Sequence, residues 1–156
     1  MKLHCINLLK ITRAVAVGLS FLVGANASAE STQKPNFIII LADDQGYADL
    51  GCFGSETIRT PQIDQLAKEG RKFTSFYVPS PLCSPSRAGL LTGCYPKRLS
   101  IAKGVLFPKS TIGLHPDEVT IADMLKTAGY ATACVGKWHL GHREPFLPTK
   151  QGFDSY

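Results

Sequence analysis

The feature that most constrains the fold is a nearly continuous run of β-branched and aliphatic residues over Asn36–Ala42. A strand with one face in water alternates apolar and polar residues, whereas a continuous apolar run is typical of a strand buried on both faces. Such strands occur mainly in parallel sheets, whose strands are joined by crossover connections that usually contain a helix. The run therefore predicts the α/β fold class.

The rest of the chain alternates between helix and strand signals in a way that agrees with this prediction. Each expected helix begins after a capping residue or near a proline, and two of them end at a glycine. The order strand, helix, strand, helix, helix, strand predicts an α/β sheet with right-handed crossovers. After the strand at 36–42, the expected elements are a helix capped by Thr60 and closed by Gly70, a strand at 73–78, a short helix starting around Ser84-Pro85, a helix at 121–128 capped by Thr120, and a strand at 130–135.

Polar groups follow the expected strands at one edge of this sheet. Asp43 and Asp44 end the first run, the turn Cys83–Arg87 follows the second, and Lys137 and His139 follow the third. Ligands of α/β sheets bind beyond the carboxyl ends of the strands. The three sets are therefore expected to meet and form a site.

Each set has a chemical interpretation and an ordinary structural alternative. Adjacent carboxylates such as Asp43 and Asp44 repel each other, which a hard divalent cation relieves, although such a pair is more often a solvated turn. Cys83 is expected to begin a helix with Arg87 one turn later, and both the helix N-terminus and the guanidinium group favour an anion at that position. Cys83 is then either a nucleophile beside an anionic substrate or, in the ordinary alternative, a half-cystine. Lys137 and His139 flank Trp138, and in an extended segment both reach toward a bound oxyanion.

Composition and charge narrow the class of protein. The chain has 156 residues, of which 44% are hydrophobic and 19% charged, which excludes collagen-like, coiled-coil and wholly disordered chains. The formal net charge is +5, but Lys2, Lys10 and Arg13 lie in an N-terminal stretch that has no acidic residue. The remainder has no basic cluster, so nucleic-acid binding is not expected.

The N-terminus has the pattern of a secretory signal peptide. A basic segment precedes the apolar residues 14–23, and Ala27-Ser28-Ala29 resembles a cleavage site. The apolar segment is too short for a membrane-spanning helix, so no stable membrane anchor is expected. We therefore expect a signal peptide at residues 1–29, cleavage after Ala29, and a secreted or periplasmic protein.

Secretion leaves four cysteines after the cleavage site. In an oxidising compartment they can form two disulfides, and their spacing matches no zinc site. These cysteines are Cys52, Cys83, Cys94 and Cys134.

Four segments together carry a resemblance to a known family. Residues 83–93 contain C-x-P-x-R followed by a small apolar stretch and Thr-Gly, and residues 136–141 read Gly-Lys-Trp-His-Leu-Gly. With the opening 35–44 and the closing 147–156, they resemble the formylglycine-dependent, arylsulfatase-like sulfatases of the alkaline-phosphatase-like superfamily, in order and spacing, over nearly all of 34–156.

The resemblance implies a fold, a cofactor and a reaction. The fold is the N-terminal portion of a mixed, mainly parallel sheet flanked by helices. A maturase that recognises the unfolded Cys-x-Pro-x-Arg segment converts Cys83 to formylglycine. One oxygen of the hydrated aldehyde attacks the sulfur of a carbohydrate or aryl sulfate ester and the alcohol leaves. The second oxygen then expels sulfate.

The resemblance also implies roles for individual side chains. Asp43, Asp44 and the modified Cys83 hold Ca²⁺, or else Mg²⁺, and Arg87 holds the diol oxygens. Lys137 and His139 bind the sulfate, with His139 near the diol as a proton carrier. Two further histidines, His115 and His142, have no matching role and are expected in solvated loops.

Sulfatase catalytic domains are several times longer than this chain. Residues 30–156 are therefore expected to form the N-terminal segment of such a domain, with the remaining metal and sulfate ligands beyond Tyr156. We expect the 156-residue chain alone to be inactive or nearly so. Two alternatives remain open: a phosphate or phosphonate ester hydrolase of the same superfamily, and a secreted, non-catalytic binding module in which Cys83 is a half-cystine.

Overall fold

A computed structural model describes residues 33–156, which divide into two units at Ile40. Residues 33–40, the described part of the first unit, contain neither helix nor strand. The predicted signal peptide at residues 1–29 lies outside the described residues. Within the described part, no helix has the length and apolar character needed to cross a membrane.

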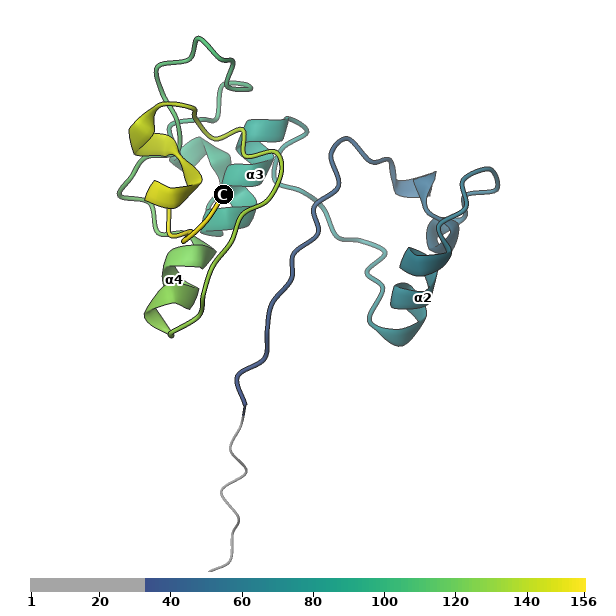
Figure 1. The fold of residues 1–156 in the computed structure, drawn as a ribbon. Coiled ribbons are helices and arrows are strands. Elements are labelled where there is room, and N and C mark those ends of the chain that lie inside the picture. Colours follow the sequence, from purple (N-terminus) through teal and green to yellow (C-terminus); the bar gives the residue numbers. More distant parts are fainter. Residues whose placement is uncertain (1–32) are drawn as a thin grey trace, which may run out of the picture. The chain divides into compact units, whose positions relative to one another are not determined.

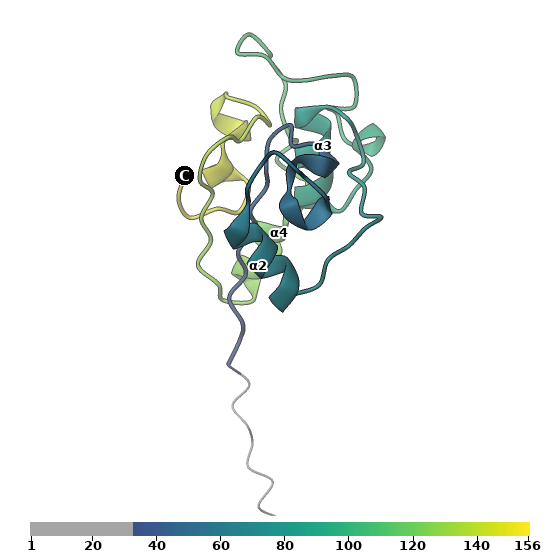
Figure 2. The ribbon, with the colours of Figure 1, turned by 90° about the vertical axis from the view of Figure 1, so that its right-hand side faces the viewer.

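The second unit, residues 41–156, contains three α-helices and several short 3₁₀ helices (Figure 1). The α-helices are α2 (Pro61–Glu69), α3 (Cys83–Thr92) and α4 (Ile121–Thr127). Helices α3 and α4 contact each other, and Figure 2 gives a second view of the same elements. The 3₁₀ helices are η2 (Tyr47–Asp49), η3 (Gly51–Phe53), η4 (Pro96–Arg98), η5 (Glu144–Phe146) and η6 (Pro148–Lys150).

Helix α2 begins and ends where the sequence predicts. Thr60 occupies the N-cap position, Pro61 the first helical position, and Gly70 follows the last turn. The Thr60 hydroxyl does not cap a helix N–H, however. It accepts a hydrogen bond from the Gly51 amide and donates one to Asp64 Oδ1, so it ties the helix start to η3.

Helix α4 begins with the capping arrangement that its sequence indicates. The Thr120 hydroxyl accepts a hydrogen bond from the Asp123 amide at 3.2 Å, and Asp123 Oδ2 accepts one from the Thr120 amide at 2.9 Å. This reciprocal pairing satisfies two N–H groups at the start of the helix. The helix ends at Thr127, one residue earlier than expected, and Gly129 then adopts a positive φ of 84°.

Helix α3 begins at Cys83, slightly earlier than the predicted start at Ser84-Pro85. Pro85 lies within the first turn, where a missing backbone N–H removes no intrahelical hydrogen bond. The helix ends at Thr92, and the C-cap residue Gly93 has a φ of 67°. Cys83 is therefore the first residue of a helix, in agreement with the prediction that it lies at a helix start.

The three predicted strands at 36–42, 73–78 and 130–135 do not form strands in the described part of the chain. The pairing recorded there is a parallel bridge between Ala133 and Ser155. An extended segment is a strand only when a neighbouring segment completes its hydrogen-bond ladder. Apolar side chains of the predicted strands remain exposed: Ile38 by 86%, Ile40 by 87% and Val135 by 94%.

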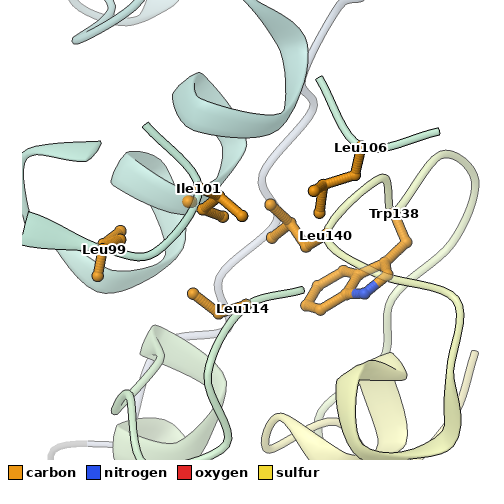
Figure 3. Close-up of a cluster of buried hydrophobic side chains, with 7 residues drawn as sticks. Leu99, Ile101, Leu106, Leu114, Trp138 and Leu140 are labelled. Carbon is orange, nitrogen blue, oxygen red and sulfur yellow. The ribbon is translucent and has the colours of Figure 1, made fainter. Parts of the chain in front are cut away.

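A small buried cluster lies beside the segment that carries Lys137 and His139 (Figure 3). The Leu114 amide donates a hydrogen bond to the Leu140 carbonyl at 2.8 Å, which fixes the end of that segment. Both leucine side chains are fully buried. The cluster consists of Ala88, Leu99, Ile101, Leu106, Leu114, Trp138 and Leu140.

Trp138 joins this cluster to the C-terminal part of the chain. Its indole N–H donates to the Phe146 carbonyl at 2.8 Å, and its ring meets Phe153 edge to face at 6.0 Å. Because Trp138 lies between Lys137 and His139, these contacts restrict the backbone that carries both neighbouring side chains.

Candidate active site

Two cationic side chains, Arg87 and Lys137, come from separate parts of the chain and meet at Asp43. Its Oδ1 accepts a hydrogen bond from Arg87 Nη2 at 3.0 Å, and its Oδ2 accepts one from Lys137 Nζ at 2.7 Å. Arg87 Nη1 also donates to the Lys137 carbonyl at 2.7 Å. The end of the first apolar run, helix α3 and the segment after 130–135 are therefore joined at one place.

Cys83 and Asp44 border this charged group. The Cys83 sulfur lies 3.7 Å from Lys137 Nζ and 4.0 Å from Asp44 Oδ1. Asp44 has a φ of 54°, a left-handed conformation that is uncommon for a residue other than glycine. Such backbone strain is often found at functional sites. The structure thus brings together Asp43, Asp44, Cys83, Arg87 and Lys137.

The protonation of the group follows from these contacts. The hydrogen bond from Lys137, and then that from Arg87, lowers the pKa of the Asp43 carboxyl below its usual value. The same hydrogen bond to Asp43 raises the pKa of the Lys137 amine. Both side chains are therefore charged at neutral pH. The Arg87 side chain is only 12% exposed, whereas those of Asp43 and Lys137 are open to water.

A metal ion has a partial set of ligands here. One donor atom from each of Asp43, Asp44 and Cys83 lies within 4.8 Å of the others, the one such group found in residues 33–156. Two carboxylates suit a hard cation such as Ca²⁺, which prefers six to eight oxygen ligands, whereas a thiol does not. An oxygen in place of the Cys83 sulfur fits the same cation better. The residues present fit part of a Ca²⁺ or Mg²⁺ site.

His139, the sixth expected site residue, has a different partner. Its Nε2 lies 2.7 Å from the Leu106 carbonyl oxygen, and its φ is 59°. Its Nδ1 is buried and has no hydrogen-bond partner in the described structure. Within residues 33–156, no hydrogen bond joins His139 to the group around Asp43.

Sequence reasoning missed the two groups that hold His139. The Leu106 carbonyl accepts from the ring, and the Ser84 hydroxyl accepts from the Leu106 amide at 3.0 Å. A backbone carbonyl has no sequence signal, and Ser84 occupies the unspecified second position of C-x-P-x-R. The other two described histidines, His115 and His142, are exposed, as expected for solvated loops.

The four cysteines of the described part are free thiols. Neither of the two disulfides that secretion permits is formed among them. Cys94 and Cys134 pack against the buried cluster, and burial raises the pKa of the Cys134 thiol. Cys83 differs from both because it lies beside Lys137 at the start of a helix.

Comparison with known proteins identifies the family. Residues 35–156 match the protein family described as Sulfatase. This chain belongs to the sulfatase family. Human arylsulfatase A is 49% identical over 139 residues, which cover 88% of this chain and 27% of that protein. Mouse steryl-sulfatase is 48% identical and covers 96% of this chain and 26% of its own length.

Solved sulfatase structures share the fold of this region. The crystal structure of Ps i-CgsB aligns with a TM-score of 0.75 at 46% identity, covering 78% of this chain and 27% of that one. The PsFucS1 sulfatase from Pseudoalteromonas sp. aligns with a TM-score of 0.71 at 39% identity, covering 89% and 28%. The chain therefore has the architecture of the N-terminal region of a sulfatase. It spans about a quarter of the length of the curated relatives it matches.

Proposed function

We propose that this chain supplies the nucleophile-bearing part of a sulfuric ester hydrolase of the arylsulfatase type. The observation that carries the proposal is the meeting of Asp43, Asp44, Cys83, Arg87 and Lys137. These residues come from three distant parts of the chain, and each lies in a segment that resembles a sulfatase signature. Membership of the sulfatase family supports the same reaction class.

Cys83 is the position proposed for the nucleophile. A maturase acting on the unfolded C-x-P-x-R segment converts it to formylglycine, which in its hydrated form supplies an oxygen that attacks the sulfur of a sulfate ester. The position at the first turn of α3 favours negative charge there, because the amide dipoles of a helix give its N-terminus a partial positive charge. Lys137, at 3.7 Å from the Cys83 sulfur, adds a full positive charge.

Arg87 and Lys137 are proposed to bind and orient the charged group at position 83 and the sulfate. Fixed cations placed where negative charge develops are among the strongest contributors to catalysis. Arg87 is held near position 83 by its bonds to Asp43 and to the Lys137 carbonyl, and its bond to Asp43 is rearranged when that carboxylate binds a metal ion. His139 is proposed to bind sulfate and to carry the proton between the nucleophile and the leaving group.

Asp43, Asp44 and the modified Cys83 are proposed to hold Ca²⁺ or Mg²⁺. When bound, the ion supplies positive charge that stabilises the oxygens of the sulfate. Three donor groups fall short of the six to eight oxygens that Ca²⁺ prefers. For this reason we propose that the 156-residue chain alone is inactive or nearly so, and that ligands beyond Tyr156 complete the site in a longer form.

The proposed substrate is a sulfate ester of a carbohydrate or an aromatic alcohol. One solved relative, Ps i-CgsB, is described in complex with k-i-k-neocarrahexaose, which is a carbohydrate. Residues 1–29 are proposed to direct export to the periplasm or the exterior.

The test compares hydrolysis of an aryl sulfate and of the matching aryl phosphate by the longest natural form of the protein and by the 156-residue chain. We expect the long form to prefer the sulfate, with Cys83→Ala inactive and the 156-residue chain no faster than its own Cys83→Ala variant. Preference for the phosphate supports the phosphoesterase alternative instead. Absence of both activities, with Cys83 in a disulfide, supports the binding module.

A further inference from the structure

We propose that the turn at residues 107–110 binds a sugar ring of the substrate next to the scissile sulfate ester. The Phe107 ring stacks on the apolar face of that sugar, and the Lys109 amine pairs with a second sulfate group on it. The substrate class is then a multiply sulfated carbohydrate and not a simple aryl sulfate. The proposal rests on the proposed function in taking the group around Cys83 as the site, but its test measures binding and not turnover.

Two hydrogen bonds close this turn. The Ser110 amide donates to the Phe107 carbonyl at 2.8 Å, and the Phe107 amide donates to Ser110 Oγ at 2.9 Å. Pro108 occupies the second position of the turn, which suits the fixed φ of proline. The backbone that carries Phe107 and Lys109 is therefore preorganised and loses little freedom when a ligand binds.

The turn begins at a peptide group that contacts His139. The Leu106 carbonyl, whose carbon is bonded to the Phe107 nitrogen, lies 2.7 Å from His139 Nε2. The Leu106 amide donates to Ser84 Oγ at 3.0 Å, and Ser84 directly follows Cys83 in helix α3. Because a peptide group is planar, one rigid unit joins the start of the turn to the residue that contacts His139. The turn therefore borders the candidate site.

The exposure of Phe107 differs in kind from that of most other apolar side chains. Phe107 is 65% exposed, although it lies directly after the buried Leu106. Exposed apolar residues at 36–42 and 73–78 lie in segments with the composition of buried strands, so a neighbouring strand is the partner that they suit. Phe107 instead lies in a turn with proline, lysine and serine, which is typical of a surface loop. Its ring is therefore suited to a ligand and not to a strand.

Lys109 adds a positive charge to the same turn. It is exposed, and the ion pairs of residues 33–156 do not include it. Residues 70–116 contain seven lysine and arginine residues and no aspartate or glutamate, so the surrounding sequence supplies no carboxylate to neutralise it. A pyranose ring has an apolar face of C–H groups, and its sulfate groups are permanent anions. An aromatic ring and a cation on one rigid turn match both features.

The test measures binding by calorimetry to the 156-residue chain that carries Cys83→Ala, which excludes turnover. The probes are a dextran sulfate hexasaccharide, an unsulfated dextran of the same length, and polyvinyl sulfate of similar length, which carries sulfate without a sugar ring. We expect Phe107→Ala to weaken binding of the dextran sulfate about two- to tenfold, and Lys109→Gln about two- to fivefold.

Two exposed residues outside the turn provide matched controls. Phe76→Ala removes an exposed aromatic ring, and Lys97→Gln removes an exposed positive charge. Neither is expected to change the affinity for the dextran sulfate, and Trp138 emission reports whether each variant is folded. Equal effects of the turn variants and the controls overturn the proposal, as does undetectable binding of the dextran sulfate. Equal binding of dextran and dextran sulfate also overturns it, as does a Phe107→Ala variant that weakens both sulfated probes alike.

Lys137→Gln separates failure of this proposal from failure of the proposed function. A sulfated sugar that occupies both the turn and the site loses affinity with Lys137→Gln as well as with the turn variants, which supports both. A loss with the turn variants and none with Lys137→Gln rejects the site at Lys137 and the proposed function, while the turn remains a carbohydrate-binding surface. A loss with Lys137→Gln alone overturns this proposal and leaves the proposed function standing.

Discussion

Replacing Thr120 by valine removes the hydroxyl that ties the start of α4 to the C-terminal segment, while keeping the shape of the side chain. The hydroxyl oxygen accepts from the Asp123 amide at 3.2 Å. Its single proton has two acceptors within reach, Asp123 Oδ2 at 2.8 Å and the buried Gln151 carbonyl at 2.9 Å. Loss of an N-cap hydroxyl costs about 1 kcal/mol. A buried carbonyl left without its donor costs about 1–3 kcal/mol more. We expect Thr120→Val to lower the free energy of unfolding by about 2–4 kcal/mol.

Urea denaturation followed by tryptophan fluorescence measures this change directly, because Trp138 is the only tryptophan of the chain and is buried. With a urea dependence of about 2 kcal/mol per molar, the midpoint falls by about 1–2 M. Thr127→Val is the matched control, at the exposed end of the same helix, where the hydroxyl donates to the Met124 carbonyl. We expect that control to change stability by less than about 0.5 kcal/mol. Equal losses in the two variants would refute the reasoning.

Three further outcomes are expected. The hydrogen bond from Lys126 lowers the pKa of the Asp154 carboxyl from 3.8 to about 2, so the stability that this carboxylate contributes is complete above pH 3.8 and is lost as the pH falls toward 2. Asp154→Asn removes this acid-dependent loss of stability. An NMR titration that gives Asp154 a pKa near 3.8 contradicts the prediction. Calorimetry of the chain with Ca²⁺ is expected to show weak binding, with a Kd of about 1 mM or more, because the chain supplies fewer oxygen ligands than a complete Ca²⁺ site. Asp43→Asn weakens this binding further, and the exposed control Glu56→Gln leaves it unchanged. Equal affinities in both variants oppose the metal site. Burial raises the pKa of the Cys134 thiol above 9.0, so the rate of its alkylation by iodoacetamide continues to increase above pH 9. An alkylation rate that reaches a plateau below that pH would be inconsistent with the raised pKa.

The helix boundaries were predictable because local chemistry sets them. The Thr120 and Asp123 side chains satisfy the first amides of α4, and Pro61 and Gly70 delimit α2, whatever the rest of the chain does. The hydrogen bond that the Thr60 hydroxyl accepts was not predictable, because its donor, the Gly51 amide, comes from a different segment.

Strands depend on distant partners in a way that helices do not. The run 36–42 has the composition of a buried strand, yet it is not a strand in the described part of the chain. Apolar composition indicates which segments are suited to burial, but pairing depends on which segments lie beside them. The α/β prediction is therefore supported by the match to solved sulfatases and not by strands in the structure itself.

The candidate site was largely predictable because its residues lie in short, recognisable segments. Asp43, Cys83, Arg87 and Lys137 meet as expected, although the strands whose ends were expected to bring them together do not form in the described residues. His139 was placed with them by sequence, whereas the structure pairs its ring with a backbone carbonyl. The sequence of side chains does not indicate where a backbone carbonyl lies, so the partner of His139 could be identified only from the structure.

Mass spectrometry of the peptide that contains Cys83 tests the central claim most directly. The chain is co-expressed with a formylglycine-generating maturase that converts a reference C-x-P-x-R peptide, then digested without reduction. The account predicts an aldehyde at Cys83 and thiols at the three other cysteines of the described part. An unmodified Cys83 thiol, or a disulfide that includes Cys83, would contradict the assignment of this residue as the nucleophile of a sulfatase.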